Sequence, residues 1–141
     1  MKKLLVLFGV LIVISGCSSS PTPTHQITQA PSERVYLYQN YLSDGSTVVF
    51  IRDKGLVGSG CYANIYIDGN LVSKLEIKEK AQFYVEAGDH ILGSSIEGRG
   101  LCSFNNPRLE TDVKLKANET KYFRVFTDNN GNIEIKPTTL Y

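Results

Sequence analysis

The sequence contains no tryptophan, only two histidines, and a single methionine, which is the initiator. It also lacks an excess of charge, since 15 basic side chains face 14 acidic ones. A near-neutral domain has neither the basic surface that binds nucleic acid nor a polybasic patch for anionic lipid. Histidine is too scarce to supply several general bases or metal ligands. What is plentiful is tyrosine, phenylalanine and β-branched residues, which favour strands.

No apolar run is long enough for a membrane-spanning helix, which needs about 20 residues. The longest run, residues 4–14, is about half that length. Lys2 and Lys3 precede it, and the small residues Ser15 and Gly16 follow it. A basic start, a short apolar core and small residues in this order are typical of a signal peptide. We therefore expect residues 1–16 to be removed.

Ile14-Ser15-Gly16-Cys17 resembles the lipobox of bacterial lipoproteins. The resemblance implies cleavage before Cys17, a diacylglyceryl group on its thiol, and often an acyl chain (such as palmitate) on its amine. Two or three acyl chains give stable anchoring, at about 0.8 kcal/mol for each buried CH₂. Ser18 stands where an aspartate retains Gram-negative relatives on the inner membrane, which implies the outer membrane, facing the periplasm. The alternative is an ordinary secretory signal followed by an unrelated cysteine.

Residues 17–33 are rich in proline and hydroxyl side chains and poor in apolar mass. Such a composition predicts a disordered tether that carries the lipid anchor, with a reach of roughly 20–25 Å. His25 lies alone in it, and we interpret it as a solvated side chain rather than a metal ligand. The folded domain is expected to span residues 34–141.

From residue 34 onward apolar and polar residues alternate with a period of two. The pattern predicts an all-β domain of eight or nine short strands, an antiparallel β-sandwich with a small β-barrel as the alternative. The expected strands are 34–41, 47–52, 62–67, 70–77, 81–85, 90–96, 108–116, 121–127 and 133–135. Residues 47–52 form a nearly continuous apolar run, which predicts a strand that is buried on both faces. Asp68-Gly69 predicts a type I′ hairpin, with Leu71, Leu75 and Ile77 on one face of the second strand. Residues 121–127 are expected to pair with 108–116.

Cys61 and Cys102 remain once Cys17 is lipidated. An even pair beyond the inner membrane predicts a disulfide, which would close a loop of about 42 residues and contribute roughly 4 kcal/mol. A metal or redox pair is the alternative, although there is no CxxC spacing and no histidine nearby. The glycines beside each cysteine, from Gly55 to Gly60 and at Gly98 and Gly100, are interpreted as turns with positive φ rather than as a phosphate loop.

Catalytic groups are hard to find in this sequence. His90 has Asp89 beside it, but Ser94 would lie about 13 Å away along a strand, so we expect no catalytic residues. Glu86, Asp89 and Glu97 are interpreted as solvated edges, and residues 128–132 as a plain turn rather than a Ca²⁺ loop. No metal or cofactor is expected. The remaining candidates for contact with a partner are Arg99, between two glycines, and the tyrosines of residues 36–41.

Three phrases carry a family resemblance: Val35-Tyr36-Leu37-Tyr38, the hairpin at 65–72, and the corner Phe83-Tyr84-Val85-Glu86-Ala87-Gly88-Asp89-His90. They resemble small bacterial lipoproteins with a prealbumin-like, PEGA-related β-sandwich of unknown function, over residues 34–127. Ala87 departs from the proline usual at that corner. The resemblance implies a sandwich in the cell envelope and assigns no activity, cofactor or catalytic residue.

The sequence thus favours a non-enzymatic envelope lipoprotein that acts as a binding or structural module. Its expected partners are the membrane, through the lipid, and an envelope protein or glycan, but not nucleic acid. One alternative is an inhibitor of a lytic or proteolytic enzyme that uses the bridged glycine loops as a wedge. Another is a small hydrolase that depends on His90.

Overall fold

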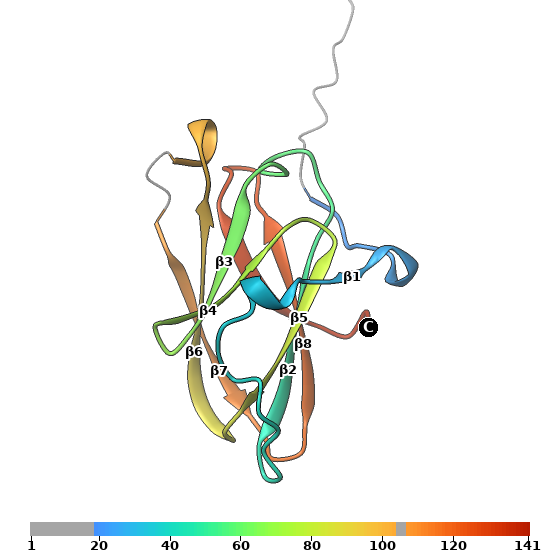
Figure 1. Cartoon of the computed structure of the whole chain (residues 1–141), viewed down its shortest axis with the longest axis vertical. Coiled ribbons are helices and arrows are strands. Elements are labelled where there is room, and N and C mark those ends of the chain that lie inside the picture. Colours follow the sequence, from blue (N-terminus) through green and yellow to red (C-terminus); the bar gives the residue numbers. More distant parts are fainter. Residues whose placement is uncertain (1–18, 104–106) are drawn as a thin grey trace, which may run out of the picture.

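The computed structural model describes residues 19–103 and 107–141, which fold into two β-sheets packed face to face (Figure 1). The predicted signal peptide, Cys17 and Ser18 lie outside the described residues. Within the described part, no helix combines the length and the apolar character needed to cross a membrane.

The first sheet has the order β1-β5-β2-β8-β9, and the second has the order β4-β3-β6-β7. The strands are β1 (Thr28–Gln29), β2 (Ser46–Arg52), β3 (Tyr62–Ile67), β4 (Asn70–Leu75), β5 (Glu79–Val85), β6 (Gly88–Glu97), β7 (Leu109–Leu115), β8 (Thr120–Thr127) and β9 (Ile133–Thr138). The described residues also form three 3-10 turns: η1 (Thr24–Gln26) before β1, η2 (Ser32–Arg34) between β1 and β2, and η3 (Gly100–Ser103) between β6 and β7. The predicted β-sandwich is confirmed, and the strands do not close into the alternative barrel.

The core lies between the sheets and is built around aromatic rings. Phe50 of β2 stacks on Phe123 of β8 at 5.5 Å between ring centroids and meets Phe83 of β5 edge-on at 5.8 Å. Val49 and Ile51 face the other side of β2 and are also buried. The expected burial of this strand on both faces is therefore confirmed.

The Asp68-Gly69 hairpin is confirmed, because φ is 49° at Asp68 and 79° at Gly69, as a type I′ turn requires. The predicted face of β4 is wrong. A register shift opposite Ile65 and Tyr66 inserts one extra residue into the β3–β4 pairing. As a result Val72 joins Leu75 in the core, while Leu71 is only half-buried.

The predicted pairing of residues 108–116 with 121–127 is also wrong. β7 pairs with β6, and β8 pairs with β2 in the other sheet. The short turn between them crosses from one sheet to the other, with Asn118 at φ 60°. The β2–β8 and β1–β5 pairs are parallel, and the other pairs are antiparallel.

Residues 34–41 do not form the expected strand. The Tyr36 N–H donates to the carbonyl of Val72 in one sheet, and the Tyr38 carbonyl accepts from the Tyr84 N–H in the other. Tyr38 has a φ of 56° between these contacts. A segment that crosses from the edge of one sheet to the edge of the other cannot continue either ladder.

Residues 19–33 are not the disordered tether that their composition predicts. They lie along the first sheet, where β1 pairs with β5 and where Thr22 and Ala30 are buried. Arg34 closes the segment with two hydrogen bonds to the carboxylate of Glu79, at 2.6 and 2.7 Å. The exposed edge of β5 gives this polar segment backbone partners that its composition cannot reveal. The folded domain therefore begins no later than Ser19.

Candidate functional site

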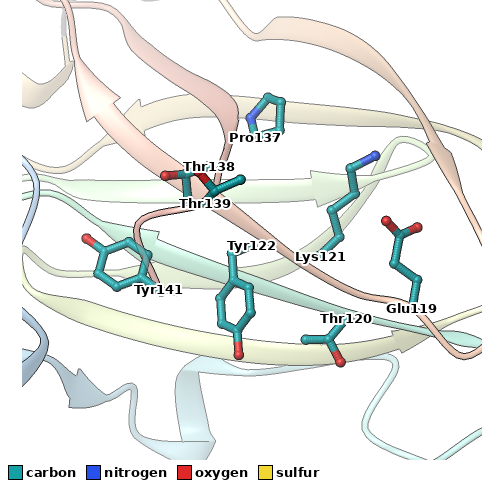
Figure 2. Close-up of a pocket in the computed structure, with 8 residues that line it drawn as sticks. All are labelled: Glu119, Thr120, Lys121, Tyr122, Pro137, Thr138, Thr139 and Tyr141. Atoms are coloured by element: carbon teal, nitrogen blue, oxygen red, sulfur yellow. The ribbon is translucent and has the colours of Figure 1, made fainter.

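A groove of about 740 Å³ lies beside the C-terminal residues (Figure 2). β8 and β9 form its floor, and the last residues of the chain form one wall. Its lining combines hydroxyl groups, two opposite charges and two aromatic rings: Glu119, Thr120, Lys121, Tyr122, Pro137, Thr138, Thr139 and Tyr141. Such a lining can both stack on a ligand and hydrogen-bond to it.

Two tyrosines define the groove. The rings of Tyr122 and Tyr141 are 6.5 Å apart and tilted by 42°. The Tyr141 hydroxyl donates to the carbonyl of Thr22 at 3.0 Å, and burial raises its pKa. Tyr141 is thus fixed in place by the docked N-terminal segment.

Tyr122 also lines a second hollow of about 430 Å³, which continues over the same sheet toward Gln29 and Lys80. Sequence reasoning missed this tyrosine and selected those of residues 36–41 instead. The available signal was the alternation in β8, where Phe123 and Val125 are core residues and Tyr122 must therefore face outward.

The tyrosines of residues 36–41 do not make one binding face. Tyr38 packs against the core, whereas Tyr36 and Tyr41 are exposed. Tyr41 meets Tyr84 edge-on at 5.5 Å between centroids. These rings serve local packing more than a common surface.

His90 is held by two acceptors. Its Nδ1 lies 2.6 Å from a carboxylate oxygen of Asp68, and its Nε2 lies 2.8 Å from the carbonyl oxygen of Glu86. Desolvation lowers the pKa of His90, but these two hydrogen bonds and the charge of Asp68 outweigh it, so the pKa lies above its ordinary value. The ring ties the β3–β4 turn to the β5–β6 corner.

Two other candidates of the sequence analysis, Ser94 and Glu97, form contacts away from His90. Ser94 is buried and donates to the carbonyl of Ile133 at 2.7 Å. Glu97 forms an ion pair with Lys74 at 2.8 Å. The structure does not bring these side chains together with His90 into a catalytic arrangement.

The Asp128 side chain organises the turn of residues 128–132, which the sequence analysis weighed against a Ca²⁺ loop. The Asp128 carboxylate accepts hydrogen bonds from the backbone of Asn130 and Asn132 and from the Asn132 side chain, at 2.8 to 3.0 Å. Across residues 19–103 and 107–141, no group of three or more His, Cys, Asp or Glu side chains is placed to hold a metal ion.

The predicted disulfide between Cys61 and Cys102 is confirmed, with 5.5 Å between the Cα atoms. It joins the loop of residues 53–61 to η3. Gly58, Gly98 and Gly100 take the expected positive φ, at 70°, 155° and 61°, but the prediction is wrong for Gly55 and Gly60, which do not. Arg99 is exposed and directly precedes η3. The disulfide therefore holds the loop of residues 53–61 and η3 together at the same end of the sandwich.

No protein-family model and no curated protein matches this sequence.

Proposed function

We propose that this chain is a lipid-anchored protein of the bacterial envelope whose sandwich acts as a non-enzymatic binding module. The anchor is Cys17, and the binding surface is the groove at Tyr122. The groove carries the proposal because it is open, lies outside the core, and combines aromatic faces with hydroxyl groups. The resemblance of the hairpin and corner phrases to PEGA-related envelope lipoproteins supports the same reading.

The chemistry of the groove suits a ligand rich in hydroxyl or amide groups. Thr138 and Thr139 offer hydroxyls, and Tyr122 and Tyr141 offer ring faces. Lys121 and Glu119 carry opposite charges at the end of the groove away from Tyr141, so the lining has no strong preference for a cationic or an anionic ligand. A glycan strand of the envelope fits this lining better than a charged small molecule.

Tyr122→Ala should weaken binding to purified peptidoglycan sacculi by about tenfold, the loss of one aromatic anchor. The measurement is a pull-down of the purified protein over a range of sacculus concentrations. Tyr41→Ala is the matched control, because Tyr41 is 70 % exposed and lies outside the groove. Equal loss in both variants, or no binding by the parent protein, would reject the groove as a glycan site.

Intact-protein mass spectrometry of the membrane fraction tests the anchor. We expect a mass that begins at Cys17 and includes acyl chains, and a gain of two hydrogens on reduction of the Cys61–Cys102 bridge. Cys17→Ser should remove the acyl mass, while the paired control Cys61→Ser/Cys102→Ser should retain it. An unlipidated mass in the parent protein would remove the anchor from the proposal.

A further inference from the structure

One end of the sandwich gathers the two most exposed large apolar side chains of the described residues. Leu56 is 82 % exposed on the loop of residues 53–61, and Leu101 is 84 % exposed on η3. Val57 lies beside Leu56 and is 39 % exposed. The disulfide holds the two loops together. We call this set of three side chains the apolar tip.

The first described residue is docked at the same end. The Thr127 N–H donates to Ser19 Oγ at 2.9 Å, and Ser20 and Lys54 exchange backbone hydrogen bonds at 2.9 and 3.1 Å. Gly55 allows this approach, because a Cβ there would lie 3.0 Å from the Ser19 Cα. Figure 1 shows the chain entering the domain beside the loop of residues 53–61 and at the end that carries η3.

The distance from this docking point to the lipid is short. Cys17 is two residues before Ser19, and an extended chain spans at most about 3.6 Å per residue, so about 7 Å separates them at most. The headgroup region of one leaflet is about 5–7 Å deep. A lipid on Cys17 therefore leaves no tether long enough to lift this end of the domain clear of the bilayer surface.

We propose that the apolar tip contacts the phospholipid bilayer and inserts Leu56 and Leu101 into its interface. This inference rests on the proposed lipid anchor at Cys17. Lys54 and Arg99 lie two residues before the two leucines, one on each loop. A cation beside an apolar side chain suits the boundary between headgroups and acyl chains.

The contact fixes how the domain stands on the membrane. With the apolar tip in the interface, the long axis of the sandwich rises from the bilayer (Figure 1). Thr120, at the start of β8, then lies far from the membrane, and the groove opens sideways. The lipid and the apolar tip attach the domain to the membrane at two points. Two points fix the orientation of the domain, whereas a single acylated cysteine would leave it free to rotate.

The absence of tryptophan provides the test. Leu56→Trp, Leu101→Trp and the control Tyr41→Trp each introduce one fluorophore into the full lipidated protein. Tyr41 is exposed, and the turn of residues 41–45 lies at the opposite end of the sandwich (Figure 1). Each protein is reconstituted into phosphatidylcholine–phosphatidylglycerol vesicles with brominated acyl chains. We expect emission at shorter wavelength and strong bromine quenching at positions 56 and 101, and neither at position 41.

Flotation of the same vesicles separates the two proposals. If the Leu56→Trp and Leu101→Trp proteins float with the vesicles but are quenched only by aqueous iodide, the anchor stands and the apolar tip is overturned. Protein that does not float overturns the anchor itself. A wavelength shift at these positions only after a lysozyme or protease is added would overturn membrane contact in favour of an inhibitory wedge.

Discussion

Replacing Arg52 by methionine should lower the free energy of unfolding by about 3–5 kcal/mol, because three buried backbone carbonyls lose their donor, at a cost of about 1–3 kcal/mol each. Arg52 is 2 % exposed. Its Nη1 donates to the carbonyls of Cys61 and Leu75 at 2.7 and 2.6 Å, and its Nη2 donates to the carbonyl of Gly58 at 2.8 Å. Methionine fills similar space but leaves these three carbonyls without their donor.

The guanidinium is charged at neutral pH in spite of its burial. Desolvation lowers the pKa of Arg52 to about 10, against the opposing charges of Glu79 and Glu76. Arg52→Lys should also destabilise the fold, because a single ammonium cannot reproduce the planar fork of donors.

Urea denaturation followed by circular dichroism measures the effect of both Arg52 variants. Arg108→Met is the matched control, since Arg108 is an exposed arginine whose ion pair with Glu110 should contribute less than about 1 kcal/mol. Unfolding midpoints that are equal for Arg52→Met and Arg108→Met would show that the three carbonyl contacts do not stabilise the fold.

Removing the bridge with Cys61→Ala/Cys102→Ala should lower the free energy of unfolding by about 2–4 kcal/mol. The bridged residues are 41 apart in sequence, and a loop of this length constrains the unfolded chain strongly. The measurement is again the urea midpoint, compared with that of the parent protein under reducing and non-reducing conditions. A parent protein whose midpoint is insensitive to reduction would contradict the prediction.

The two losses should not add. Arg52 binds the carbonyl of Cys61 itself, so the arginine and the bridge stabilise the same loop. Groups that share a partner commonly show coupling of about 0.5–3 kcal/mol. The triple variant should therefore lose less than the sum of the two separate effects.

Local features of this fold were predictable from sequence. Asp68-Gly69 specifies its turn through backbone conformation alone, and the alternation of β5 specifies its buried face. The disulfide followed from the even number of cysteines that remain beside Cys17 and from the oxidising compartment that the signal-peptide pattern predicts. Each of these inferences depends only on residues that are neighbours in the sequence or on the number of cysteines.

The failures share a non-local cause. The pairing of β8 depends on β2, which lies far away in sequence, and the extra residue at Val72 depends on the register with β3. Residues 19–33 are ordered because the edge of β5 offers them hydrogen bonds. The groove was missed for the same reason, because Tyr122 meets Tyr141 only after the C-terminal residues fold back beside β8.

The docked N-terminal segment has a consequence for the order of folding. Ser19 is bonded to Thr127, and the Thr22 carbonyl accepts from Tyr141, across 108 and 119 positions of the sequence. Contacts of such separation form late, because the intervening chain must first be ordered. For a chain exported from its N-terminus, as proposed above, Ser19 and Thr22 cannot complete these contacts until the last residues have crossed the membrane. Processing enzymes therefore meet the beginning of this chain before the domain has folded against it.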